Sequence, residues 1–229
     1  MKTHFCILLG LLALPAFSQE PVISTEIVTI ALNESVGGLY FENGEGISLF
    51  QATPTGLGEP LKYKGSRRFA LRTSEAEFSA GRPLPPPHVW VELPPRSERV
   101  LLACLKRGDA PVKIIAFDIG NARIGAGEYR LFNFSQSGIA VNFGGKQFAV
   151  KSGEERLVSE AKWEKEVTEI DVVMGIVKNG KAKPVYSSQW GHRPRRRNYI
   201  FMFDGPHPYT PIRICRYFDV PPRGQRTQR

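Results

Sequence analysis

Cysteine and histidine are scarce in this chain of 229 residues, which has three Cys and four His. So few cysteines exclude a disulfide-built scaffold and a zinc module made of cysteine ligands. No two histidines stand at HxH or HExxH spacing, so we predict neither a metal site nor a cofactor and assign no catalytic residue. After residue 18, no apolar run is long enough to cross a membrane.

The N-terminal segment has the pattern of an export signal. Lys2 precedes an apolar run over residues 5–14, and Ala16 and Ser18 are the small residues expected before a cleavage site. We therefore expect residues 1–18 to be a signal peptide and the mature protein to be periplasmic or extracellular, with no transmembrane segment after cleavage. A retained anchor or a buried N-terminal helix is the alternative.

Two cysteines lie beyond this leader, Cys104 and Cys215, and both stand in apolar, strand-like runs. Free cysteines buried in a core usually have such surroundings, so we predict two buried thiols. A disulfide between them, which an oxidising compartment would permit, is the alternative.

Glycine and proline are abundant and separate many short apolar segments. The 22 Gly and 18 Pro favour short elements joined by turns. Residues 22–32 and 100–105 are rich in β-branched and aliphatic side chains, and 170–176 alternates with the period of two that is typical of strands. Only 159–168 has the composition of a short helix. We predict an all-β fold of two immunoglobulin-like β-sandwich modules in tandem, with a single larger sandwich or barrel as the alternative.

Three blocks recur in the same order in the two halves, which indicates an internal duplication. Residues 39–47 resemble 131–139, 68–75 resemble 147–154, and 111–115 resemble 211–215. Chance similarity of alternating strands is the competing explanation. The predicted organisation is a first module at 19–119, a linker at 120–127, a second module at 128–220 and a basic disordered tail at 221–229.

Three segments of the second half resemble a pattern in uncharacterised exported bacterial β-sandwich proteins. They are Tyr129–Phe134, Val185–Trp190 and Arg197–Phe203. The resemblance implies a secreted β-rich fold, and it implies no activity and no catalytic residue.

Positive charge is concentrated near the C-terminus. From residue 178 to 229 there are 12 Lys and Arg against only Asp204 and Asp219. Guanidiniums suit phosphate, sulfate and carboxylate oxygens, and aromatic rings beside them could stack on a sugar or base. The candidate ligand-binding residues are Arg193, Arg195, Arg196, Arg197, Trp190 and Tyr199. A loop kept soluble by its charge, with both aromatic residues in the core or its rim, is the alternative.

These observations leave three functional hypotheses. The favoured one is a non-catalytic exported protein that serves as a binding or scaffold component of a bacterial envelope or secretome. The second is binding of a polyanion such as lipopolysaccharide, an anionic glycan or a phosphate-bearing polymer; nucleic acid is not the expected partner, because DNA would be met only outside the cell. The third is a hydrolase with a loop-built site around His88, His192 or His207.

Overall fold

The computed structural model describes residues 21–79, 81, 83–106, 108–159 and 168–221. Within these ranges almost all regular structure is β-strand, so the all-β prediction is confirmed. The predicted signal peptide lies outside the described residues, as do nearly all of the expected helix at 159–168 and of the basic tail. No helix in the described part of the chain is long and apolar enough to cross a membrane.

The described part of the first half contains eight strands and one short 3-10 helix. The strands are β1 (Val22–Ala31), β2 (Val36–Asn43), β3 (Gly46–Ala52), β4 (Leu61–Ser66), β5 (Arg68–Leu71), β6 (Val89–Glu92), β7 (Arg99–Leu105) and β8 (Lys113–Asp118), and the helix is η1 (Glu75–Phe78). One sheet has the order β4-β1-β7-β8, with β1 and β7 parallel. The hairpins β2-β3 and β5-β6 are joined by two backbone hydrogen bonds between Tyr40 and Arg72, which gives a second layer of order β3-β2-β5-β6.

The second half also contains eight described strands. They are β9 (Tyr129–Asn133), β10 (Ile139–Phe143), β11 (Lys146–Val150), β12 (Glu155–Val158), β13 (Glu169–Lys178), β14 (Lys181–Gly191), β15 (Arg197–His207) and β16 (Thr210–Asp219). One sheet has the order β12-β9-β15-β16, with β9 and β15 parallel, and the other has the order β11-β10-β13-β14.

The two halves share one strand order. Replacing β1 to β8 by β9 to β16, in sequence, converts the first pair of layers into the second, including the single parallel pairing in each half. Common ancestry of the halves stays a prediction. Two of the three sequence matches nevertheless pair strands that are not equivalent. Residues 39–47 belong to β2 and β3, whereas 131–139 belong to β9 and the start of β10. Residues 68–75 begin with β5, whereas 147–154 contain β11. Only 111–115 and 211–215 belong to equivalent strands, β8 and β16.

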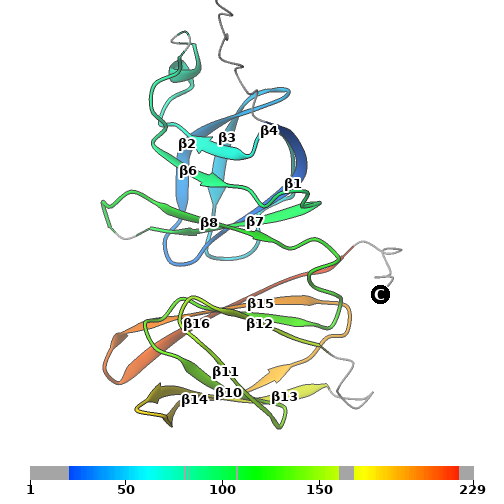
Figure 1. Cartoon of the computed structure of the whole chain (residues 1–229), viewed down its shortest axis with the longest axis vertical. Helices are drawn as coiled ribbons and strands as arrows, with labels where there is room; N and C mark the ends of the chain where they lie inside the picture. The colour runs from blue at the N-terminus through cyan, green and yellow to red at the C-terminus, as the bar shows by residue number, and fades with distance from the viewer. Residues whose placement is uncertain (1–20, 80, 82, 107, 160–167, 222–229) are drawn as a thin grey trace, which may run out of the picture.

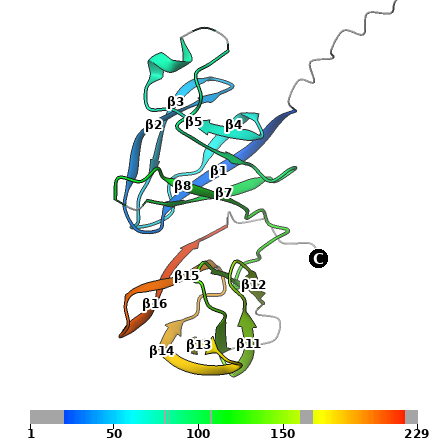
Figure 2. The same ribbon diagram turned by 60° about the vertical axis from the view of Figure 1, so that its left-hand side comes forward.

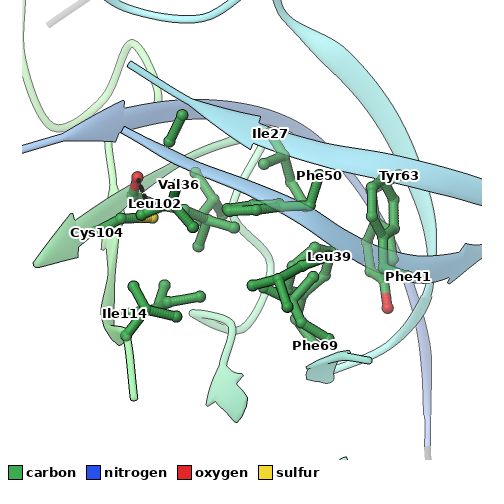
Figure 3. Close-up of a cluster of buried hydrophobic side chains, with 14 of the residues drawn as sticks. Ile27, Val36, Leu39, Phe41, Phe50, Tyr63, Phe69, Leu102, Cys104 and Ile114 are labelled. Atoms are coloured by element: carbon green, nitrogen blue, oxygen red, sulfur yellow. Dashed lines mark hydrogen bonds between the residues drawn. The ribbon is translucent and has the colours of Figure 1, made fainter. Parts of the chain in front are cut away.

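Each half encloses its own hydrophobic core between two layers. In the first, Phe41 and Phe69 pack with ring centroids 5.0 Å apart, and Tyr63 meets Phe69 edge-on at 5.2 Å (Figure 3). The three residues come from β2, β5 and β4, so the cluster ties both layers together. Trp190, which is fully buried, has the same role in the second core, where its ring stands edge-on to Phe143 at 5.6 Å.

A third hydrophobic cluster joins the halves. The sheet that contains β7 and β8 faces the sheet that contains β15 and β16 (Figures 1 and 2). Phe117 of β8 packs against Phe132 of β9 with ring centroids 4.4 Å apart, and the Tyr217 hydroxyl donates to the carbonyl of Ala31 at 3.4 Å. Ile124, inside the segment predicted as a linker, is fully buried in this cluster. The molecule is therefore a stack of four β-layers.

Burial on both faces explains the unbroken apolar runs of the sequence. Every residue from Val100 to Cys104 in β7 is fully buried, whereas a sandwich strand with one wet face would alternate. One face of β7 packs into the first core, with Leu102, and the other packs into the cluster between the halves, with Leu101. Residues 100–104 are not solvated on either face, so all of them are apolar.

Candidate functional site

The basic loop of the sequence connects β14 to β15 as a tight turn. The Arg196 amide donates to the Arg193 carbonyl at 3.0 Å, and the Gly127 amide donates to the Arg196 carbonyl at 2.8 Å. These bonds fix the backbone of the turn, while the side chains of Arg193 and Arg195 stay exposed and that of Arg196 is half-buried. Three of the four predicted guanidiniums are thus presented from one rigid turn.

Arg197, the fourth, points into the contact between the halves and is 1% exposed. Its Nε and Nη2 donate to the two carboxylate oxygens of Asp219 at 2.8 and 2.6 Å, and its Nη1 donates to Asn121 at 2.9 Å. Burial lowers the pKa of Arg197, but the hydrogen bonds to Asp219, together with the electrostatic interactions with Tyr199, Asp219 and Glu26, outweigh burial and raise it overall. This guanidinium is engaged in the contact between the halves and does not belong to the exposed basic surface.

Trp190 and Tyr199 also lie in the interior, and both are fully buried. The Trp190 indole donates to the Tyr186 hydroxyl at 2.9 Å, and Tyr199 belongs to the cluster between the halves. Burial raises the pKa of the Tyr199 phenol. Because neither ring reaches the surface, neither can stack on a sugar or base; the sequence could not distinguish a strand aromatic that faces a core from one that faces solvent.

The structure adds cations that the sequence analysis did not select. Arg216 of β16 is exposed and lies over the buried Trp190 ring at 4.2 Å, and Arg196 lies over the Phe218 ring at 3.8 Å. Lys181 and Lys183 are exposed on β14. Since β14 and β16 are edge strands of their sheets and contact one another, these side chains share one side of the second half. We call Lys181, Lys183, Arg193, Arg195, Arg196 and Arg216 the basic edge.

Few carboxylates accompany the basic edge. Of the two aspartates within the basic region, Asp219 is engaged by Arg197 and by Arg99, which contacts it at 2.6 Å. Asp204 accepts hydrogen bonds from the Gln136 amide at 3.2 Å. Neither aspartate is paired with a cation of the basic edge in these contacts. The exposed carboxylates nearest in the sheet are Glu169 and Asp171 of β13, which lie opposite Gly191 and Gln189 of β14, and the six cations of the basic edge outnumber them.

The three histidines that could have formed a loop-built site are placed on different elements. His88 is exposed at the end of the proline-rich loop before β6, and His207 is exposed at the end of β15. His192 is buried, and its Nδ1 lies 3.1 Å from the Tyr129 hydroxyl. Among the described residues, no three His, Cys, Asp or Glu side chains are grouped as metal ligands.

Both described cysteines are free thiols, as predicted. Cys104 is fully buried, and burial raises its pKa to about 12. Cys215 is half-buried, and its Sγ lies 3.6 Å from the carbonyl of Leu32 across the contact between the halves. The prediction of full burial therefore holds for Cys104 alone.

Comparison with known proteins supplies no relative: no family model matches the chain, and no curated protein sequence matches it. The resemblance to exported β-sandwich proteins therefore stays a prediction, and the function has to be argued from the geometry above.

Proposed function

We propose that the protein is a non-catalytic binding protein whose basic edge binds an extended polyanion. The observation that carries the proposal is the row of exposed cations along β14 and β16. Arg196 and Arg216 rest on aromatic rings, which restricts their side chains before any ligand arrives. Arg216 is exposed and Arg196 is half-buried, and guanidiniums can bind phosphate, sulfate or carboxylate oxygens through their planar edges.

The four-layer body serves this proposal as a rigid support. The turn that carries Arg193 and Arg195 begins and ends in buried residues, His192 and Arg197. Its position is therefore fixed by the core of the second half and by the contact between the halves. A surface fixed in this way loses little conformational entropy when it binds.

The expected setting is the envelope or the surroundings of a bacterium, as the leader predicts, with two immunoglobulin-like modules as the scaffold. The polyanion would then be lipopolysaccharide, an anionic glycan or another phosphate-bearing polymer. Cations that line an edge several strand residues long fit a polymer better than a single small anion, because successive charges of the polymer meet successive side chains.

Salt dependence of heparin binding tests this proposal. Affinity should fall steeply with ionic strength, because each contact with the polyanion releases counterions. Plotted against log salt, log K falls with a negative slope. The combined variant Arg193→Ala, Arg195→Ala, Arg196→Ala should make this slope less steep by about 2, since each lost contact removes about 0.7–0.9 from its magnitude.

A charge-matched control uses exposed lysines elsewhere, Lys62→Ala, Lys113→Ala and Lys151→Ala together. This control removes the same formal charge and should leave the slope nearly unchanged. An equal loss of affinity in both variants would show that net charge, and not the basic edge, governs binding, and the proposal would fail.

A further inference from the structure

A pocket lies in the first half, where the chain passes from one layer to the other between β4 and β5. This corner pocket has a volume of about 390 Å³. Its lining comes from the start of β1, the β2-β3 turn, β4, β5, η1 and the proline-rich loop that follows. The lining includes Lys64, Arg68, Ala70, Arg72, Phe78 and Leu84.

The walls of the corner pocket are held in place by hydrogen bonds. The Asn43 side chain joins the β2-β3 turn to β4, because its Oδ1 accepts from the amides of Gly44 and Lys64 at 2.8 and 3.0 Å and its Nδ2 donates to the Lys62 carbonyl at 3.0 Å. Gly65 leaves room for the Tyr63 hydroxyl, which would lie only 2.5 Å from a Cβ at this position. The pocket is therefore formed before any ligand binds.

The proline-rich loop, residues 83–88, borders the pocket. Arg72 fastens it, since Nη1 of Arg72 donates to the Pro85 carbonyl, while the His88 amide donates to the Leu71 carbonyl at 2.9 Å. Phe78 of η1 lies below the Arg72 guanidinium at 5.4 Å. Phe78 and Leu84 thus supply an apolar wall beside a buried cation.

Positive charge predominates in the lining. Arg68 is the first residue of β5 and Arg72 directly follows the strand, so the two stand four residues apart, and this even spacing in extended chain places them on one face. Lys64 is exposed on β4, the preceding strand. The nearest carboxylate to Arg72, that of Glu77, is 3.6 Å away, and its Oε1 already accepts the Thr73 hydroxyl at 2.8 Å. Glu42 is the acidic residue in the lining.

We propose that the corner pocket binds a small amphipathic anion, a carboxylate or phosphate monoester attached to a short apolar group. Arg68 and Arg72 would hold the anionic oxygens, and Phe78 and Leu84 would cover the apolar part. Guanidinium forks match the geometry of both oxyanions. A pocket that is mostly apolar with a few convergent polar groups is typical of sites for small molecules. The proposal is independent of the basic edge.

Calorimetric titration of the full chain with phenyl phosphate tests the proposal, with benzoate, inorganic phosphate and phenol titrated in parallel. We expect saturable binding of phenyl phosphate or benzoate at one site, and the tighter of the two identifies the oxyanion that is preferred. Inorganic phosphate and phenol should each bind at least about tenfold more weakly, because each lacks one half of the ligand. Equal binding of inorganic phosphate would overturn the proposal.

Two variants locate the site. Arg68→Ala should weaken binding about tenfold, which corresponds to the loss of one charge-assisted contact. Ala70→Leu fills the pocket without changing its charge and should weaken binding at least as much. Lys62→Ala, on β4 but outside the lining, should leave binding unchanged, as should the triple variant of the basic edge. Absence of saturable binding, or binding that survives both pocket variants, would refute the proposal; so would loss of binding in the basic-edge variant.

Discussion

Asp219→Asn is expected to destabilise the protein strongly, because Asp219 pairs two arginines at the contact between the halves. Arg197 and Arg99 both lie 2.6 Å from Asp219 Oδ2. The side chains of Arg197, Asp219 and Arg99 are only 2%, 12% and 15% exposed. The asparagine keeps the shape of the aspartate but leaves the guanidiniums without their shared carboxylate.

The magnitude follows from what each arginine retains. Arg99 keeps Glu26 at 2.6 Å, whereas Arg197 keeps only the neutral side chain of Asn121. Removing one partner of a buried ion pair costs about 3–5 kcal/mol. Because one of the two arginines stays paired, we expect the lower end, about 3 kcal/mol, which lowers Tm by about 10 °C in a chain of this size.

Urea unfolding followed by circular dichroism measures this loss. The control is Asp204→Asn, since Asp204 is exposed, and it should change the free energy of unfolding by less than about 0.5 kcal/mol. Adding Arg197→Gln to Asp219→Asn should recover part of the loss, because it removes the uncompensated buried charge. A loss below about 1 kcal/mol for Asp219→Asn would refute the structural role assigned to this network.

Three further predictions concern single positions. Gly205→Ala should lower Tm in thermal unfolding, because the added Cβ would lie 1.5 Å from the backbone carbonyl oxygen of Thr210 in the β15-β16 hairpin. Gly37→Ala is the control and should leave Tm unchanged, because its added Cβ meets no atom within 4 Å. Cys104 should resist alkylation while the protein is folded and react after unfolding without reductant; a thiol that stays blocked would show a disulfide. Burial raises the pKa of Asp118, but hydrogen bonds from Ser97, the Gly120 amide and Arg123 together lower it overall. The ionised Asp118 therefore stabilises the fold at neutral pH, and this contribution is lost as the pH falls through the folded-state pKa. Asp118→Asn should reduce the loss of unfolding free energy at acid pH, and an unchanged loss would contradict this.

The strand content of the fold could be read from the sequence, but the stacking of the halves could not. Periodicity identified 170–176 as a strand with one buried face, and Ile170, Val172 and Met174 are indeed buried. The continuous apolar run 100–105 carried the additional information that both faces are covered. A run of this length does not reveal whether the second covering layer comes from the same module or from the other half.

The candidate site was predictable only in part, for a related reason. The density of arginines in 193–197 indicated a basic surface, and Arg193, Arg195 and Arg196 lie on it. Arg197 is the first residue of β15, and its partner Asp219 is 22 residues away, so no local pattern could show that it is buried. Arg216 lies on an edge strand, and its place beside the turn depends on the pairing of β15 with β16.

Mapping the contact of a heparin oligosaccharide by amide chemical shifts tests the functional account most directly. We predict shift changes that are centred on Arg195, Arg196 and Arg216 and that diminish as salt is added. Changes confined to the first half, or spread evenly over all exposed lysines and arginines, would contradict the assignment of the basic edge as the ligand-binding surface.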